Sequence, residues 1–138
     1  AYHELLADLS EPQSVTLHRD FYPDQVQLNS EGVTLLDLDS ICRGPASIDV
    51  GNFVGHLIEE GIRCHGDARR HDEVAHVFTE TYLKARTPED AELIPLATML
   101  TLARHISISH SRNDRRSAAP DIVDHCERLL NAQEVRAK

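Results

Sequence analysis

The sequence contains no tryptophan, and tyrosine and phenylalanine occur only three times each among its 138 residues. Aliphatic side chains must therefore fill the interior, and a hydrophobic fraction of 41% is enough for the core of one domain. A long apolar run is missing too, so we expect no segment that spans a bilayer. The opening residues lack the basic flank and the apolar core of a signal peptide. We therefore expect a cytoplasmic protein that does not associate with membranes.

Paired cysteine motifs are also absent. Cys42, Cys64 and Cys126 are odd in number and widely spaced, which fits free thiols in a reducing cytosol better than a disulfide framework. Nine histidines raise the question of a metal site, but none belongs to an HExxH sequence or to a zinc-finger spacing. His71 and His76 are five residues apart on an expected helix and do not share a face well. We therefore expect the histidines to be solvated rather than bound to metal.

Basic residues are fewer than acidic ones. Lys and Arg together number 14, Asp and Glu number 23, and the formal net charge is −9. Such a charge argues against a nucleic-acid partner held through phosphate contacts. It is compatible with a cationic small substrate, although net charge reflects solubility before it reflects function.

Two regimes of composition follow one another along the chain. Short β-prone runs come first, at 15–17, 26–28 and 33–36. The sequence Asn29-Ser30-Glu31-Gly32 predicts a hairpin turn between the last two. Apolar residues then recur at helical spacing, over 49–61, 67–86, 87–110 and from 120 onward. Because three short strands cannot form an independent sheet, the sequence predicts a mainly α-helical α+β fold, with the strands packed against four or five helices.

The most informative stretch runs from His18 to Gln25 and reads HRDFYPDQ. A kinase catalytic loop reads H-R-D-x-x-x-x-N, so His18, Arg19 and Asp20 match, and Gln25 stands where asparagine is usual. An apolar strand then ends in Asp37-Leu38-Asp39, at about the distance where kinases place a metal-binding aspartate.

Phosphoryl transfer explains this set of side chains. The reaction needs a carboxylate that orients the acceptor hydroxyl and takes its proton, and it needs oxygen ligands for the Mg²⁺ that bridges the phosphates. Asp20 and Gln25 on one loop, facing Asp37 at the end of the next strand, would supply both.

A third element follows, with the sequence Gly44-Pro45-Ala46-Ser47-Ile48-Asp49-Val50-Gly51. The three elements together resemble the aminoglycoside-phosphotransferase and choline-kinase family. That family shows a pattern like H-G-D-x-x-x-x-N, then I-D-[WFL]-[DE], then G-[DP]-P-x-x-D-[LV]-[AG]. The D-F-G and A-P-E sequences of protein kinases are absent. The resemblance covers residues 18–51. It implies that residues 1–138 form the helical C-terminal lobe of a protein-kinase-like fold, in which a small β-hairpin region carries the catalytic and metal loops.

The resemblance implies chemical roles for three residues. Asp20 would be the catalytic base, or the carboxylate that orients the acceptor hydroxyl. Gln25 and Asp37 would be the Mg²⁺ ligands. Gln25 departs from the family pattern because it adds one methylene to the usual asparagine.

The same resemblance places His18, Arg19 and Asp39 around the nucleotide and its metal. His18 would fix the loop by hydrogen bonding, and Asp39 would contact a metal or one of its waters. Arg19 stands where the family usually has glycine, and we expect it to form a salt bridge with a nearby carboxylate. Asp49 would cap the helix that follows and buttress the loop.

The part of a kinase that clamps the nucleotide is not recognisable in the sequence. The seventeen residues before His18 contain neither glycine nor lysine, and the only lysines of the chain are Lys84 and Lys138. There is no Walker A sequence and no G-x-G-x-x-G. We therefore expect the N-terminal nucleotide-binding lobe to be absent from this chain, and the chain alone to be inactive.

Two functions are compatible with these features. The first is part of an ATP-dependent phosphotransferase that moves the γ-phosphate to a hydroxyl of a small molecule such as an aminoglycoside, choline or a sugar. Its cofactors would be Mg²⁺ and ATP, and its partner the missing N-lobe. The second is a non-catalytic remnant or a small-molecule-binding module. Uncovered apolar surface near the first strand and Leu5, Leu6 and Leu9 would also favour a homo-oligomer.

Overall fold

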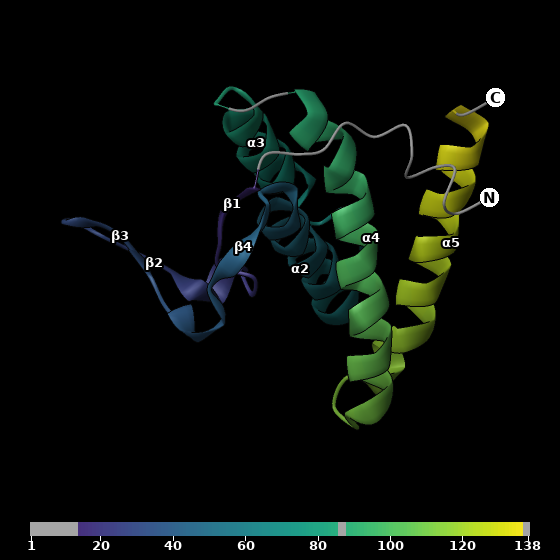
Figure 1. Ribbon diagram of the computed structural model, residues 1–138. Helices are drawn as coiled ribbons and strands as arrows, with labels where there is room; N and C mark the ends of the chain where they lie inside the picture. The colour runs from purple at the N-terminus through teal and green to yellow at the C-terminus, as the bar shows by residue number, and fades with distance from the viewer. Residues whose placement is uncertain (1–13, 86–87, 137–138) are drawn as a thin grey trace.

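In the computed structural model, which describes residues 14–85 and 88–136, two pairs of short antiparallel strands precede a bundle of helices (Figure 1). The strands are β1 (Ser14–Leu17), β2 (Val26–Asn29), β3 (Gly32–Leu35) and β4 (Cys42–Pro45). The helices are α2 (Ser47–His65), α3 (Asp72–Leu83), α4 (Pro88–Ser111) and α5 (Ala119–Arg136). Short 3-10 turns lie at Pro23–Gln25, Leu38–Ser40 and Arg116–Ala118. The predicted α+β, mainly helical class is confirmed, but the expected packing of the strands against the helices is wrong for β2 and β3, which are almost wholly exposed. The expected apolar stripe of Leu5, Leu6 and Leu9 falls outside the described residues.

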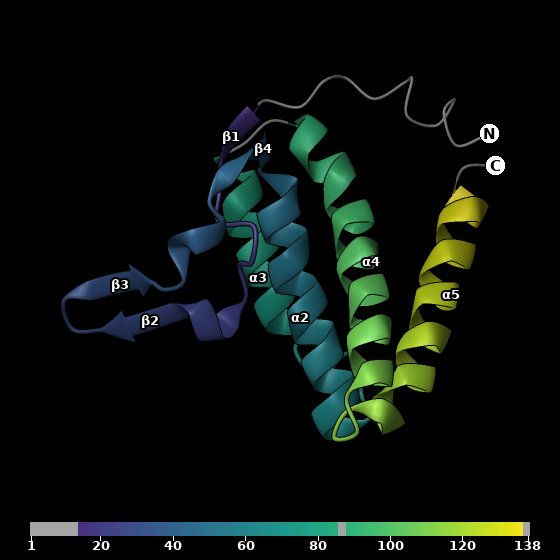
Figure 2. The same cartoon turned by 60° about the horizontal axis from the view of Figure 1, so that its bottom comes forward.

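Strands β2 and β3 form the predicted hairpin, which extends away from the helices in both ribbon views (Figures 1 and 2). Its turn is closed by Asn29, whose Oδ1 accepts hydrogen bonds from the backbone N–H groups of Glu31 at 2.9 Å and Gly32 at 3.0 Å. Gly32 has a φ of 140°, a conformation open to glycine but not to side chains with a Cβ. Local turn chemistry therefore explains why this element could be predicted.

Strand β4 pairs with β1 in antiparallel register and was not expected from the sequence. Its residues, Cys-Arg-Gly-Pro, show neither alternation nor β-branched side chains, so no periodic signal marks them. The strand is positioned by its partner. A Cβ on Gly44 would come within 2.8 Å of Leu17 Cδ1, so glycine permits the close approach, and the Arg43 side chain donates a hydrogen bond to the carbonyl of Ser14 at 2.7 Å.

Helix α2 runs past its predicted end at Gly61 and ends at His65. Gly66 follows with a left-handed φ of 64°, and the N–H groups of Gly66 and Asp67 bond back to the carbonyls of Ile62 and Gly61 at 2.9 and 3.1 Å. Gly61 instead makes room for this reversal, because a Cβ there would lie 2.5 Å from the carbonyl oxygen of Asp67. The glycine that ends the helix is therefore Gly66.

The later helices agree with the sequence in number and differ in their details. Helix α3 begins at Asp72 rather than 67, because the side chain of Asp67 accepts a hydrogen bond from the Arg69 N–H at 2.9 Å and forms a turn instead. Helix α4 continues through Pro95. The sequence Thr87-Pro88-Glu89-Asp90 predicts a helix start capped by Thr87, a residue that lies outside the described part of the chain. Among the described residues, no helix combines the length and apolar character needed to cross a membrane.

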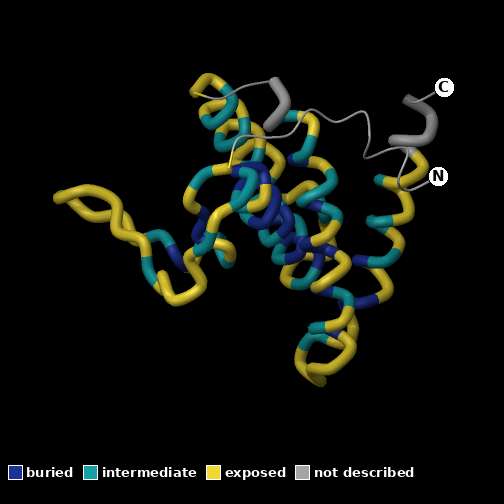
Figure 3. Tube along the Cα trace, viewed as in Figure 1, coloured by how far each residue is buried: buried dark blue, intermediate teal, exposed yellow. Residues whose placement is uncertain are grey.

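The core lies where α2, α4 and α5 meet, and Figure 3 shows buried residues gathered there while the β2–β3 hairpin is exposed. Its buried centre consists of Ile62, Leu102, Ala118 and Ile122. Helical spacing predicts that Leu93, Leu96, Leu100 and Ala103 face inward. That prediction is wrong in part, since Leu100 is 62% exposed and Ala103 is also exposed. The residues that face α2 are smaller because two glycines of α2 bring the helices close: a Cβ on Gly51 would meet Ala97 Cβ at 2.4 Å.

Candidate functional site

The loop that carries His18, Arg19 and Asp20 connects β1 to the 3-10 turn at Pro23–Gln25. Arg19 holds a left-handed backbone with a φ of 73°, which turns the chain sharply at this point. The conformation directs two successive N–H groups at one carboxylate. His18 N donates to Asp49 Oδ2 at 2.7 Å, and Arg19 N donates to Asp49 Oδ1 at 2.8 Å. A charged acceptor makes both hydrogen bonds stronger than neutral ones.

Helix α2 anchors the loop at a second point, one turn further along. Asn52 is buried, and its Nδ2 donates to the carbonyl of Phe21 at 3.0 Å. Asp49 and Asn52 are three residues apart and so share a face of the helix. The first turns of α2 therefore hold the loop at both ends. The predicted buttressing role of Asp49 is confirmed, but its predicted capping role is wrong, because no side chain caps the start of α2.

The buried ring of His18 joins the loop to the end of β3. Its Nε2 lies 2.7 Å from the carbonyl oxygen of Leu36, the residue immediately before Asp37. The backbone N–H of Leu36 in turn donates to the carbonyl of Gln25 at 2.9 Å. These contacts fit the expectation that His18 fixes the loop, and they tie the two halves of the motif to each other.

Gln25 and Asp37 meet at the base of the hairpin. Gln25 is buried and donates from Nε2 to Asp37 Oδ2 at 3.3 Å. Asp37 is exposed, with a left-handed φ of 53° that aspartate tolerates better than most residues. This hydrogen bond uses Nε2 of Gln25 and Oδ2 of Asp37. The other oxygen of each side chain, Oε1 of Gln25 and Oδ1 of Asp37, takes no part in it. A hard cation such as Mg²⁺ takes this kind of ligand.

Asp20 and Asp39 are placed differently. The half-exposed carboxylate of Asp20 is paired with Arg104 of α4, whose Nη2 lies 3.3 Å from Asp20 Oδ1. Asp39 is exposed in the 3-10 turn at Leu38–Ser40. Within the described part of the chain, the carboxylates of Asp20, Asp37 and Asp39 do not form a cluster whose ligand atoms all lie within 4.8 Å. The structure therefore joins Gln25 to Asp37, and it leaves Asp20 with another partner.

The expected salt bridge of Arg19 is not observed. Within residues 14–85 and 88–136, no carboxylate lies within 4 Å of its guanidinium group, and the residue is exposed. What Arg19 contributes to the site is its backbone N–H and its left-handed turn. A glycine, which the aminoglycoside-phosphotransferase pattern has at this position, would supply the same N–H and the same turn. Glycine adopts positive φ without a steric cost.

A group of side chains behind Asp20 was missed by sequence reasoning. Tyr22 stacks on His56 with ring centroids 4.4 Å apart, and His56 meets the buried His105 edge-on at 4.5 Å. Arg104 Nη2 lies 3.4 Å from Asn52 Oδ1 and 3.3 Å from His56 Nε2, in addition to Asp20. No local motif could have indicated these contacts, because they join the loop, α2 and α4 across separations from 34 residues (Tyr22 to His56) to 84 residues (Asp20 to Arg104).

The histidine pair is held in its neutral form. Burial, the neighbouring His105 and the positive charge of Arg104 lower the pKa of His56 to about 3. Burial also lowers the pKa of His105. At neutral pH, Arg104 is therefore the cation that faces Asp20 in this group.

Two hollows adjoin the loop. One, of about 400 Å³, is lined largely by apolar side chains, among them Leu17, Leu35, Leu38, Ile41 and Phe78. The other, of about 460 Å³, has polar and charged walls, including Tyr22, Asp24, His56, Glu59, Arg63 and Arg115. The loop thus contributes residues to both hollows, and the polar one has the groups needed to hydrogen-bond a hydroxylated molecule.

Comparison of the chain with protein-family models, curated proteins and solved structures finds no match. The family resemblance therefore depends on residues 18–51 and on the contacts that these residues make. Those contacts, from Asp49 to the loop and from Gln25 to Asp37, connect the three elements of the motif in space.

Proposed function

We propose that the chain is the catalytic, acceptor-binding lobe of an ATP-dependent phosphotransferase of the aminoglycoside-phosphotransferase and choline-kinase type. It would transfer the γ-phosphate of ATP to a hydroxyl group of a small molecule. The observation that carries the proposal is the pairing of Gln25 with Asp37 at 3.3 Å. These residues lie twelve positions apart, on either side of a hairpin, and they are the two positions at which the resemblance expects the metal ligands.

The arrangement supports different roles for three side chains, two that bind the metal and one that acts on the acceptor hydroxyl. Oε1 of Gln25 and Oδ1 of Asp37 would hold Mg²⁺, whose remaining positions would go to water and to the phosphates of ATP. Asp20, on the loop anchored by Asp49 and Asn52, would orient the acceptor hydroxyl and take its proton. Rigid anchoring matters here because positioning supplies most of the rate in phosphoryl transfer.

The nucleotide needs further groups to bind it. A phosphate-covering loop and a lysine are the usual ones, and residues 1–138 carry no recognisable copy of the loop and no lysine ahead of the catalytic loop. The proposal therefore assigns nucleotide clamping to an N-terminal lobe that acts together with this chain.

A non-catalytic binding module is the second candidate, and one contact favours it. Arg104 lies 3.3 Å from Asp20 Oδ1, so a guanidinium group occupies a carboxylate oxygen that the acceptor hydroxyl would use. Under this alternative Asp20 is a structural partner of Arg104, and the polar hollow beside Tyr22 and His56 binds a small molecule without chemistry.

An activity assay separates the two candidates. The protein as its gene encodes it is incubated with ATP, Mg²⁺ and a panel of small alcohols, aminoglycosides and sugars, and formation of ADP is measured. Catalysis by Asp20 predicts that Asp20→Asn lowers kcat by about 10²–10⁴-fold, the usual contribution of a general base. The matched control is Asp124→Asn, which alters an exposed carboxylate on α5 and should leave kcat unchanged.

The opposite outcome is equally clear. If a member of the panel binds with the same affinity to the wild type and to Asp20→Asn, and ADP forms with neither, the binding-module alternative replaces the phosphotransferase.

A further inference from the structure

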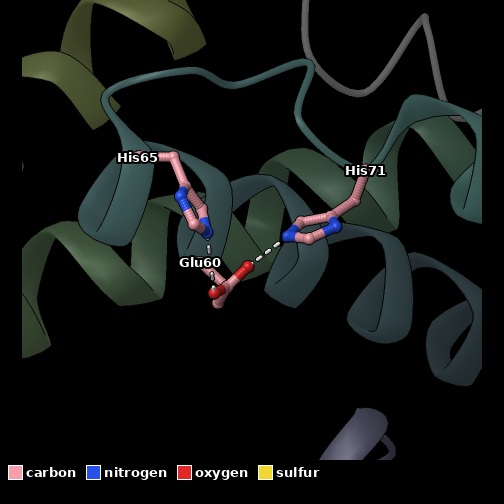
Figure 4. Close-up of side chains that lie close together, drawn as sticks. All are labelled: Glu60, His65 and His71. Atoms are coloured by element: carbon pink, nitrogen blue, oxygen red, sulfur yellow. Dashed lines mark hydrogen bonds and ion pairs between the residues drawn. The ribbon is translucent and has the colours of Figure 1, made fainter.

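A cluster of metal-ligating side chains lies at the corner between α2 and α3, and two of its members, Glu60 and His71, also line the polar hollow beside the loop. Glu60 and His65 belong to the end of α2, and His71 immediately precedes α3. One atom from each of the three lies within 4.8 Å of the others. Figure 4 shows both imidazole rings turned toward the Glu60 carboxylate, one to each oxygen. His65 Nε2 is 3.7 Å from Oε1, and His71 Nε2 contacts Oε2 directly.

The backbone explains why these residues converge. Gly66 reverses the chain at the end of α2, and Gly61 lets the returning segment pass close to the helix. The Asp67 carboxylate accepts from the Arg69 N–H and forms a tight turn that leads into His71. A short, hydrogen-bonded connection therefore carries His71 back beside Glu60, which is eleven residues earlier in the sequence.

The chemical character of the cluster selects a type of ion. Two imidazole nitrogens and one carboxylate are a common ligand set for Zn²⁺, whereas Mg²⁺ and Ca²⁺ prefer oxygen ligands alone. A glutamate carboxylate is ordinarily ionised at neutral pH, so Glu60 offers an anionic oxygen beside the two imidazole nitrogens.

We propose that Glu60, His65 and His71 bind a Zn²⁺ ion that joins the end of α2 to the start of α3. Ligands bound tetrahedrally at about 2.1 Å from zinc lie about 3.4 Å from one another, so the present spacing needs only small side-chain movements. A water molecule would take the fourth position, because the three residues are only partly buried or exposed.

The consequence concerns the attachment of α3. No residue of α3 is buried, and its main anchor is Phe78, which stacks on Phe53 of α2 at 4.2 Å. An ion bound through His71 would add a second point of attachment, at the N-terminal end of this helix. Since any ligand that binds only the folded state stabilises it, zinc should slow the opening of α3.

Calorimetric titration of the metal-free protein with ZnCl₂ and with MgCl₂ tests the site. We expect one Zn²⁺ per chain in this site, a tenfold or larger loss of affinity in each of His65→Ala and His71→Ala, and no competition by Mg²⁺. His76→Ala is the matched control, because His76 is an exposed histidine of α3 outside the cluster and its variant should bind zinc like the wild type. Hydrogen exchange should slow in α3 when zinc is added.

X-ray absorption at the zinc edge keeps the test independent of any variant. We expect the spectrum to show nitrogen and oxygen neighbours of zinc at about 2.0–2.2 Å, with the scattering pattern of imidazole rings. A spectrum dominated by sulfur neighbours at about 2.3 Å would show that cysteine binds the ion instead. The proposal is also overturned if the wild type binds no zinc, or if His76→Ala weakens binding as much as His71→Ala does.

Discussion

Two residues of the candidate site, Arg19 and Asp37, hold left-handed backbone with φ values of 73° and 53°. A Cβ makes this conformation unfavourable by about 1–2 kcal/mol for most L-residues, and aspartate is among the residues that tolerate it best. Arg19 therefore bears the larger strain. The compensation is visible in the loop, because the left-handed turn lets two successive N–H groups reach Asp49.

This strain predicts that Arg19→Gly is more stable than Arg19→Ala. Both variants lose the same exposed side chain, but only glycine removes the Cβ, and its greater flexibility in the unfolded chain offsets part of the gain. We expect a difference of about 0.5–1 kcal/mol in the free energy of unfolding, measured by urea denaturation. An alanine variant as stable as the glycine variant would show that the backbone at this position is not strained.

At the scale of single residues, local contacts could be predicted and distant ones could not. The resemblance places Gln25 and Asp37 at one metal, and the hairpin between them explains why they meet in the structure. Asp49 belongs to the third element of the same motif. His56 lies on α2 beyond the end of the motif and Arg104 lies on α4, so their approach to Asp20 depends on how α4 packs on α2. A sequence pattern carries no signal for such packing.

At the scale of secondary structure, the crossing of α2 and α4 depends on two glycines on one face of α2. A Cβ on Gly51 would meet backbone atoms of α4, namely Ala97 C and Thr98 N, each at 2.7 Å. A Cβ on Gly55 would meet mainly the side chain of Thr101, at 2.7 Å from Cγ2. The backbone cannot move aside as readily as a side chain, so Gly51 constrains the helix pair more strongly.

Alanine substitution should therefore destabilise the protein at both glycines and more at Gly51. Helix propensity alone favours alanine by about 1 kcal/mol, but overpacking costs typically about 1–3 kcal/mol, and we expect the loss at Gly51 to exceed the gain by about 1–2 kcal/mol. Ser107→Ala, at an exposed position of α4, should change the free energy of unfolding by less than about 0.5 kcal/mol. Equal or increased stability of Gly51→Ala in thermal and urea unfolding would contradict this account.

The spacing of apolar residues predicts which helices and strands exist better than it predicts which side of each one is buried. The long helices and the hairpin carry strong local signals, whereas β4 has none and depends on pairing with β1. The inward face of α4 was misassigned at Leu100 because the largest apolar side chains were expected to be buried. Large apolar side chains do not fit where α4 meets the glycines of α2, because the two helices are too close there. Small residues such as Ala97 and Thr101 occupy this contact instead.

At the scale of the whole molecule, the β2–β3 hairpin presents an apolar face that the described residues do not cover. Residues 26, 28, 33 and 35 share one face, and Leu28 is paired directly with Val33. Leu28 is 76% exposed and Val33 is 66% exposed, although alternation of this kind normally marks a strand with one buried face. The opposite face is polar, with Gln27 paired to Thr34.

This face predicts self-association of the 138-residue chain through the hairpin. An isolated two-stranded hairpin with uncovered apolar side chains gains free energy when a second copy covers it, because apolar surface leaves water. We expect the sedimentation coefficient to rise with protein concentration. The double variant Leu28→Lys, Val33→Lys should weaken the association by about tenfold or more, since it places charges directly in the contact.

The control uses the same strands and the same added charge on the other face. Gln27→Lys combined with Thr34→Lys changes a cross-strand pair that is exposed and already polar, so its association should match the wild type. Two results would refute the prediction: a monomer at every concentration, or equal weakening by both double variants. Equal weakening would mean that net charge controls association, because both variants carry the same two added charges and differ only in the face that bears them.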